Sequence, residues 1–294
     1  MDEDALARAL KDGRLAGVAL DVFDRELMTE HQLFEFEHAV LTPHLGASTV
    51  EAQDKAGSAI AEMVILALSG QFVPYAVNVS AAAEVSEQVR AFLPLAEKLG
   101  AIVTGLAEGP MRALEAQYVG GLAEHDTRAL TLAALKGSLG MVVHEPVSYV
   151  NAPILARERG IAVSERKSAA SRDYVNLVTF VADTEAGEVV VSGTLVGVRG
   201  GERLVHVFDF DVDIAPARHM AILLYEDRPG VIGSVGTLLG RAGVNIGGMD
   251  VGRKAVGGLA VMCLTVDTPI PPGVLVQIER AIGTKRARFL TLPG

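Results

Sequence analysis

The sequence has almost no cysteine and no long apolar run, the features typical of disulfide-stabilised secreted proteins and of membrane-spanning proteins. Its 294 residues include one cysteine, Cys263, so no intramolecular disulfide can form. That residue lies within the apolar run 259–264, which predicts a buried structural thiol. The sequence contains no apolar run of about 18 residues and does not open on a basic segment followed by an apolar one. We therefore expect a cytoplasmic protein.

Positive charge is also scarce. Lysine and arginine total 26 against 36 aspartate and glutamate residues, a formal net charge of -10. This balance argues against nucleic acid or an anionic membrane surface as a partner. The hydrophobic share of 50% with only 21% charged residues indicates folded, core-forming material. The length predicts two or three domains.

The glycine-rich signature of dinucleotide binding is missing. No G-x-G-x-x-G segment occurs in the 294 residues, so the usual cradle for a pyrophosphate is absent. The nearest pattern recurs every three or four residues, at Gly230, Gly233, Gly236 and Gly240. Glycines at that interval share one face of a helix, where we expect them to allow close packing.

The chemistry-bearing stretch is 41–49. The apolar run 39–41 predicts a strand ended by Pro43, which places His44 just beyond the carboxyl end of that strand. Ligands bind at that edge in open α/β sheets. Ser48 or Thr49 is suited to cap the helix that follows. On position alone, a purely structural loop histidine is an equal alternative.

A second strand upstream favours the chemical interpretation. Residues 17–23 form a near-continuous apolar run, typical of a strand buried in a parallel sheet, and Glu26 follows it. Two successive parallel strands would bring Glu26 and His44 to the same edge. A carboxylate beside an imidazole orients the ring and favours its charged form, which suits proton transfer in hydride-transfer chemistry.

These two segments resemble the D-2-hydroxyacid dehydrogenase family, specifically its D-3-phosphoglycerate dehydrogenases. The matching residues are Ala19-Leu20-Asp21-Val22-Phe23 and Leu41-Thr42-Pro43-His44-Leu45-Gly46-Ala47-Ser48-Thr49. The resemblance implies NAD-dependent oxidation of 3-phospho-D-glycerate to 3-phosphohydroxypyruvate, which opens L-serine biosynthesis. It implies that His44 is the catalytic acid–base and Glu26 its carboxylate partner. Asp21 and Gly46 would lie on the cofactor side of the site, and no metal is implied.

The family also carries a glycine-rich loop and a catalytic arginine upstream of these residues. The chain therefore resembles an N-terminally truncated dehydrogenase that begins with an α/β remnant of a Rossmann-type domain. We expect this polypeptide alone not to oxidise phosphoglycerate, because nothing evident holds the pyrophosphate or clamps the substrate carboxylate. A mis-called gene start would give the same sequence as a natural truncation.

The middle of the chain predicts an α+β domain. The cofactor-binding remnant and its return helix, 50–69, span residues 1–78, and the second domain spans 79–216. Its predicted helices are 84–99, 128–136 and 150–160, and its strands are 112–119, 161–164, 175–182, 189–198 and 204–208. It resembles the intervening domain of long-form phosphoglycerate dehydrogenases. That implies a second phosphorylated-ligand site, for which only Arg203 is carried over, while the acidic segment 207–213 would repel a phosphate.

Residues 217–294 predict a ferredoxin-like sandwich in the order β-α-β-β-α-β. The segments 225–231 and 243–246 resemble an ACT domain, a module that binds small amino acids, usually between paired copies. By this resemblance Tyr225, Asp227 and Asn245 contact L-serine, and the domain forms a homo-oligomer. A carboxylate for the ammonium group and an amide for both polar ends suit an amino acid. The alternative is that Asp227 caps a helix and Asn245 shapes a turn.

Two functions follow. The first is a serine-regulated phosphoglycerate dehydrogenase; the second is a catalytically inactive, serine-binding regulatory fragment. A serine dehydratase is disfavoured, since its cluster needs several cysteine ligands and only Cys263 is present. Domain motion at 78–79 and 215–216 is the expected route of effector coupling.

Overall fold

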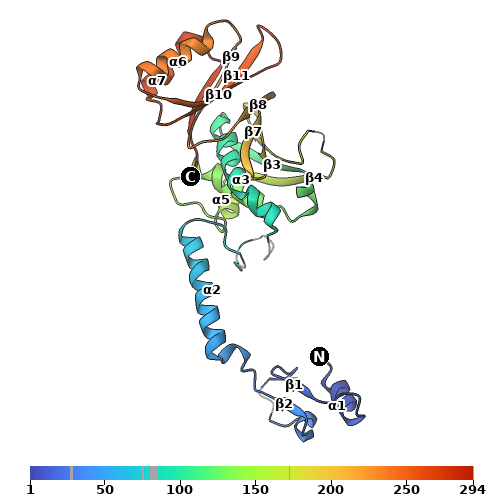
Figure 1. The fold of residues 1–294 in the computed structure, drawn as a ribbon. Coiled ribbons are helices and arrows are strands. Elements are labelled where there is room, and N and C mark those ends of the chain that lie inside the picture. The colour runs from blue at the N-terminus through green and yellow to red at the C-terminus, as the bar shows by residue number, and fades with distance from the viewer. Residues whose placement is uncertain (27–28, 75, 78, 80–84, 172, 294) are drawn as a thin grey trace. The chain divides into compact units, whose positions relative to one another are not determined.

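The structure is a computed structural model, and it describes residues 1–26, 29–74, 76–77, 79, 85–171 and 173–293. The chain forms two compact units, Met1–Ser69 and Gly70–Gly294 (Figure 1). The predicted boundary at Asn78 and the predicted helix start at Glu84 fall outside the described residues. None of the described helices is both long and apolar enough to cross a membrane.

The first unit is a small α/β arrangement. It contains α1 (Glu3–Lys11), β1 (Val18–Leu20), η1 (Gln32–Glu35), β2 (Ala39–Leu41), η2 (Gly46–Ser48) and α2 (Val50–Leu68). The two strands pair in parallel, as predicted, with Val18 opposite Ala39. Thr49 caps α2, because its hydroxyl accepts a hydrogen bond from the amide of Ala52 at 3.2 Å. Both strands therefore end at the edge where the polar loops begin.

The intervening domain, in the second unit, is a sheet packed against helices. Its six strands follow the order β4-β3-β5-β6-β7-β8. Its elements are α3 (Glu87–Leu106), β3 (Met111–Gly120), η3 (Gly121–Glu124), α4 (Arg128–Gly140), α5 (Ala152–Glu158), β4 (Ala162–Ser168), β5 (Asn176–Thr184), β6 (Gly187–Val196), β7 (Gly201–Val207) and β8 (Phe210–Ile214). Leu114, Ala116 and Tyr118 alternate along β3 and are fully buried, which puts one face of the sheet in the core.

Two glycines show where the sequence-based helix boundary was wrong. Gly100 was expected to end a helix, but α3 continues to Leu106. A Cβ at Gly100 would lie 2.1 Å from the carbonyl oxygen of Ala134, and one at Gly137 would lie 1.9 Å from that of Glu97. Both glycines are therefore needed where α3 and α4 cross, and not as helix ends. In contrast, Gly233, Gly236 and Gly240 face open space, so the expected close packing is not seen.

The C-terminal domain has the predicted ferredoxin-like order. It comprises β9 (His219–Glu226), α6 (Val231–Arg241), β10 (Ile246–Arg253), β11 (Leu259–Val266), α7 (Pro272–Ile282) and β12 (Arg286–Thr291). The antiparallel sheet has the order β10-β11-β9-β12. Side chains alternate along β9: Leu223 joins the core under α6 and α7, whereas Ile222 joins the core of the intervening domain.

The two domains of the second unit thus share one hydrophobic core. Val261 and Cys263 of β11 belong to the same buried cluster as the residues of α3 and α4. Glu108 reinforces the junction through ion pairs with Arg286 at 2.9 Å and Arg288 at 3.3 Å. Hinge motion at 215–216 would have to separate these buried surfaces, which makes a large rotation there costly.

Candidate acid–base and effector sites

The structure brings His44 and Glu26 together at the edge of the first unit. Beyond β2, Nδ1 of His44 lies 2.5 Å from Oε1 of Glu26, and the two side chains are 51% and 50% exposed. The backbone amide of His44 donates to the carbonyl of Asp21 at 2.8 Å. The pair is therefore oriented by the loops that follow both strands while its imidazole stays accessible.

His44 has an unusual backbone conformation. Its φ of 54° lies in the left-handed region, which costs free energy for a residue with a Cβ, although histidine tolerates it better than branched residues. The hydrogen bond to Asp21 offsets part of that cost. The loop thus presents the imidazole at the carboxyl edge of the parallel strands, where ligands bind in α/β folds.

Asp21 organises this loop. Its carboxylate accepts hydrogen bonds from the hydroxyl of Thr42 at 2.5 Å and the amides of Leu45 and Gly46 at 2.7 Å each. The Thr42 bond above all, and then the two amides, lower the pKa of Asp21, because they stabilise the carboxylate. A Cβ at Gly46 would lie 3.0 Å from the carboxylate, so glycine permits this close approach. Thr42 was not singled out in the sequence, because its position next to Pro43 was the only signal that it lies in this loop.

A cavity of about 360 Å³ adjoins the pair. Its polar lining is Asp21, Glu26, Thr29, Thr42 and His44, and its apolar walls are Phe23, Phe34, Leu41 and Pro43. The described lining contains no lysine or arginine, so an anionic substrate group or a pyrophosphate finds no cation in it. The apolar walls fit a flat ring, but the residues present do not fit a whole dinucleotide. No cluster of possible metal ligands occurs among the described residues.

Two of the predicted effector residues lie at one end of the C-terminal sheet. Tyr225 is 1% exposed in the core beneath α6 and α7. Burial, followed by the nearby charge of Asp227, raises the pKa of Tyr225. The carboxylate of Asp227 already forms an ion pair within the chain, because its Oδ2 lies 3.1 Å from Nη1 of Arg253. Arg253 was not among the residues predicted from the sequence. It is the last residue of β10, which runs parallel to β9.

Asn245 lies at the opposite end of the same sheet. Its amide donates to Asp267 at 2.7 Å, and the neighbouring Ile246 pairs with Val266. The strands rise by about 3.3 Å per residue, so about 20 Å separates Asn245 from Asp227. The reason is topological: α6 carries the chain back before β10 starts, parallel to β9. One chain therefore does not bring Asn245 to the other two residues.

Arg203, the basic residue considered for a phosphorylated ligand, is paired. Its Nε lies 3.1 Å from Oδ1 of Asp213 on β8. The acidic segment that contains Asp213 is an alternating strand, in which Phe210 and Val212 are buried while Asp211 and Asp213 face solvent. The charge of Arg203 is therefore offset within the fold, and nothing here favours phosphate.

Three family models match the chain in succession. The NAD-binding domain of D-isomer-specific 2-hydroxyacid dehydrogenases matches residues 1–46, the D-3-phosphoglycerate dehydrogenase intervening domain matches 88–208, and the ACT domain matches 219–283. The chain is 42% identical over 294 residues to a D-3-phosphoglycerate dehydrogenase of Synechocystis sp., covering 99% of this chain and 53% of the relative. The corresponding enzyme of Mycobacterium tuberculosis is 40% identical over 293 residues, covering 99% and 55%.

The chain is similar to D-3-phosphoglycerate dehydrogenases along 99% of its length. A relative from Bacillus subtilis, 33% identical over 294 residues, covers 100% of this chain, which covers 56% of it. The chain thus spans about half the length of the curated relatives it matches. The order of NAD-binding segment, intervening domain and ACT domain expected from the sequence is confirmed. NAD is the cofactor that the matched domain binds across this dehydrogenase family.

Proposed function

We propose that this chain supplies the proton-transfer pair and the regulatory module of an NAD-dependent enzyme that oxidises 3-phospho-D-glycerate to 3-phosphohydroxypyruvate. The observation that carries the proposal is the 2.5 Å contact between His44 and Glu26 at the carboxyl edge of β2. A carboxylate on Nδ1 fixes the ring and leaves Nε2 to take the hydroxyl proton of a bound hydroxy acid. In such enzymes NAD accepts the hydride.

The chain alone is expected to be inactive. Its cavity beside His44 offers no described cation for the substrate phosphate or carboxylate, and the sequence has no pyrophosphate loop. Purified chain mixed with 3-phosphoglycerate and NAD should form no NADH. Turnover that disappears in His44→Asn would contradict this expectation and favour a complete catalytic site.

The acid–base geometry has its own test. The Nδ1 proton of His44, held against Glu26, should give a downfield proton NMR signal that Glu26→Gln removes. The same unit contains a second pair, His31 and Glu3, whose Nε2 and Oε2 lie 3.3 Å apart. Glu3→Gln is therefore a matched control that should leave the His44 signal in place. A signal that persists in Glu26→Gln would contradict the proposed orientation.

L-Serine is the proposed effector, held between two copies of the chain. Asp227 and Arg253 form one charged half of the site, which suits an ammonium and a carboxylate. The separation of Asn245 from this pair within one chain supports a composite site, to which a second copy contributes its Asn245. The catalytically inactive, serine-binding fragment is the second candidate function, favoured by the lack of lysine or arginine among the described residues that line the cavity beside His44.

A mixing experiment tests the composite site. Asp227→Ala and Asn245→Ala should each abolish serine binding in calorimetric titration of the separate variants. In mixed dimers of the two variants, one of the two sites holds both native residues, so an equal mixture that pairs at random should regain binding at about a quarter of all sites. Failure of the mixture to bind serine, with mixed dimers present, would contradict the shared site.

A further inference from the structure

A second ligand cavity lies in the intervening domain, apart from both sites described above. It has a volume of about 370 Å³ and lies between α4, α5 and β4. Six of its ten lining residues are apolar: Leu132, Leu135, Pro153, Ala156, Ile161 and Val163. The polar ones are Arg128, Thr131, Arg157 and Glu165. Its size and mixed lining are those of a small-molecule site.

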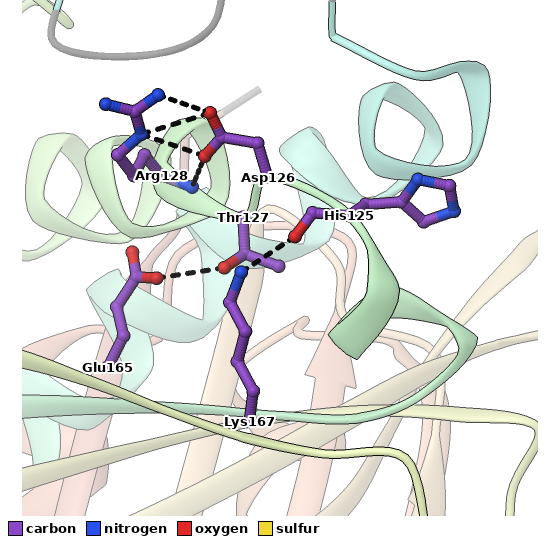
Figure 2. A network of polar contacts seen from close by, with 6 residues as sticks. All are labelled: His125, Asp126, Thr127, Arg128, Glu165 and Lys167. Atoms are coloured by element: carbon purple, nitrogen blue, oxygen red, sulfur yellow. Dashed lines mark hydrogen bonds and ion pairs between the residues drawn. The ribbon is translucent and has the colours of Figure 1, made fainter.

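Glu165 is held in place but not neutralised. Its carboxylate accepts hydrogen bonds from Thr127 at 2.9 Å and Thr131 at 2.5 Å (Figure 2 shows the first). The buried hydroxyl of Tyr118 contacts Thr131 at 2.7 Å and extends this chain into the core. All these donors are neutral, and no cation of the described residues forms an ion pair with Glu165. A carboxylate has about four lone-pair sites, so two remain open to a positively charged donor.

The neighbouring cations are engaged elsewhere. Arg128 is bound by the carboxylate of Asp126, with its Nε 2.9 and 3.0 Å from the two oxygens (Figure 2). Arg128 in turn lowers the pKa of Asp126 to about 2, as expected for a tight ion pair. Lys167, two residues from Glu165 on β4, donates to the carbonyl of His125 at 2.7 Å. Asp126 above all, and Glu165 more weakly, raises the pKa of Arg128, but neither Arg128 nor Lys167 forms an ion pair with Glu165.

Arg157 supplies the opposite charge. It stands exposed in the last turn of α5 and lines the cavity, and within the described part of the chain its side chain forms no ion pair. Among the described residues, the cavity therefore presents one carboxylate and one guanidinium that form no ion pair, with an apolar wall beside them. A simple anion would meet Glu165 and a simple cation would meet Arg157, so a ligand with both charges fits better than either.

We propose that this cavity binds an apolar α-amino acid in its zwitterionic form. The ammonium group donates to Glu165, the carboxylate accepts from Arg157, and a side chain of about leucine size packs on Leu132, Leu135 and Ala156. Charge-assisted hydrogen bonds at both ends fix the ligand, and the apolar wall selects against a polar side chain such as that of serine. The site is thus distinct from the effector site of the C-terminal domain.

Calorimetric titration of the full chain with L-leucine tests the proposal. Leucine should bind, whereas leucinamide, which lacks the carboxylate, and 4-methylpentanoate, which lacks the ammonium group, should each bind at least about tenfold more weakly. Arg157→Ala should weaken leucine binding by a similar factor. Arg159→Ala is the matched control, because Arg159 lines a different cavity with Thr104 and Ser138. Saturating serine should leave the leucine isotherm unchanged.

Glu165→Gln tests the other end of the ligand. Thermal unfolding of this variant is measured in parallel, since the carboxylate also anchors two threonines; Arg157→Ala, on an exposed residue, avoids that complication. The absence of leucine binding by the native chain up to millimolar concentration would overturn the proposal. Equal losses in Arg157→Ala and Arg159→Ala would also overturn it, as would 4-methylpentanoate binding as tightly as leucine.

Discussion

The two units of this chain differ in what holds their residues in place. In the first unit, Ala7 and Leu33 are the buried apolar side chains of the described part, while Val40 is 66% exposed and Ile60 is 64% exposed. In the second unit, a continuous core runs through the intervening domain and into the C-terminal sheet. Hydrogen bonds around Asp21 shape the acid–base loop of the first unit, whereas burial of apolar side chains stabilises mainly the second unit. The proposed chemistry and the stability of this chain therefore reside in different places.

The largest expected effect comes from crowding the core of the second unit. Gly137→Val would place side-chain atoms on the backbone of α3, since even a Cβ would lie 1.9 Å from the carbonyl of Glu97. We expect a loss of more than about 3 kcal/mol in the free energy of unfolding, or failure to fold. Gly140→Ala, three residues along the same helix where a Cβ meets nothing within 4 Å, is the control. Equal tolerance of both variants in denaturant titrations would show that the helices do not cross so closely.

Truncations on the two faces of β9 test whether the second unit is one cooperative body. Ile222→Ala opens the core shared with the intervening domain, and Leu223→Ala opens the core beneath α6 and α7. Each should cost about 2–5 kcal/mol and shift the same single unfolding transition, because the two cores lie on opposite sides of one strand. Calorimetric scans that resolve two transitions, each sensitive to one variant only, would contradict the shared core.

A smaller effect should appear at high pH. Burial raises the pKa of Cys263 from its ordinary 9.0 to about 12. The folded state therefore favours the neutral thiol, so this contribution to stability is complete below the unfolded pKa and is lost as pH rises from 9.0 toward 12. Cys263→Ala should be less stable at pH 7 yet show a flatter decline over that range in denaturant titrations. Equal slopes for the two chains would place the thiol outside the core.

The smallest effect is expected in the first unit. Glu26→Gln removes an ion pair whose two partners are about half exposed, so the free energy of unfolding should change by less than about 0.5 kcal/mol. The same substitution removes the orientation proposed for His44. A large loss of stability, measured by denaturant titration beside Glu3→Gln, would mean that the acid–base pair is structural.

Periodicity predicted most of the regular elements from the sequence. The helix 50–69 appears as α2 (Val50–Leu68), and the apolar run 39–41 is β2, because side-chain spacing decides both. Two features were not predicted. The sequence predicted that Gly100 ends a helix, but the structure shows that this glycine allows the backbone of α4 to pack closely against α3. The strand β8 was hidden by its aspartates, although their alternation with buried residues is itself the strand pattern.

The candidate sites were also predicted only in part. Parallel strands brought Glu26 to His44 as predicted, since both loops leave one sheet edge. The grouping of Asp227 with Asn245 came from the resemblance, and strand topology separates them within one chain. Arg253 escaped attention because its proximity to Asp227 depends on the pairing of β10, β11 and β9. Motifs within a loop were readable, whereas partners across a sheet were not.

The contrast between a first unit that lacks a cofactor loop and a second unit proposed to bind an effector is tested most directly by calorimetric titration of the purified chain with L-serine and, separately, with NADH. The account predicts binding of serine, abolished by Asp227→Ala, and no heat with NADH, since the chain has no pyrophosphate loop. Binding of NADH would contradict the account, because the first unit would then hold a dinucleotide without that loop. The absence of binding heat with serine would contradict the effector site proposed for the second unit.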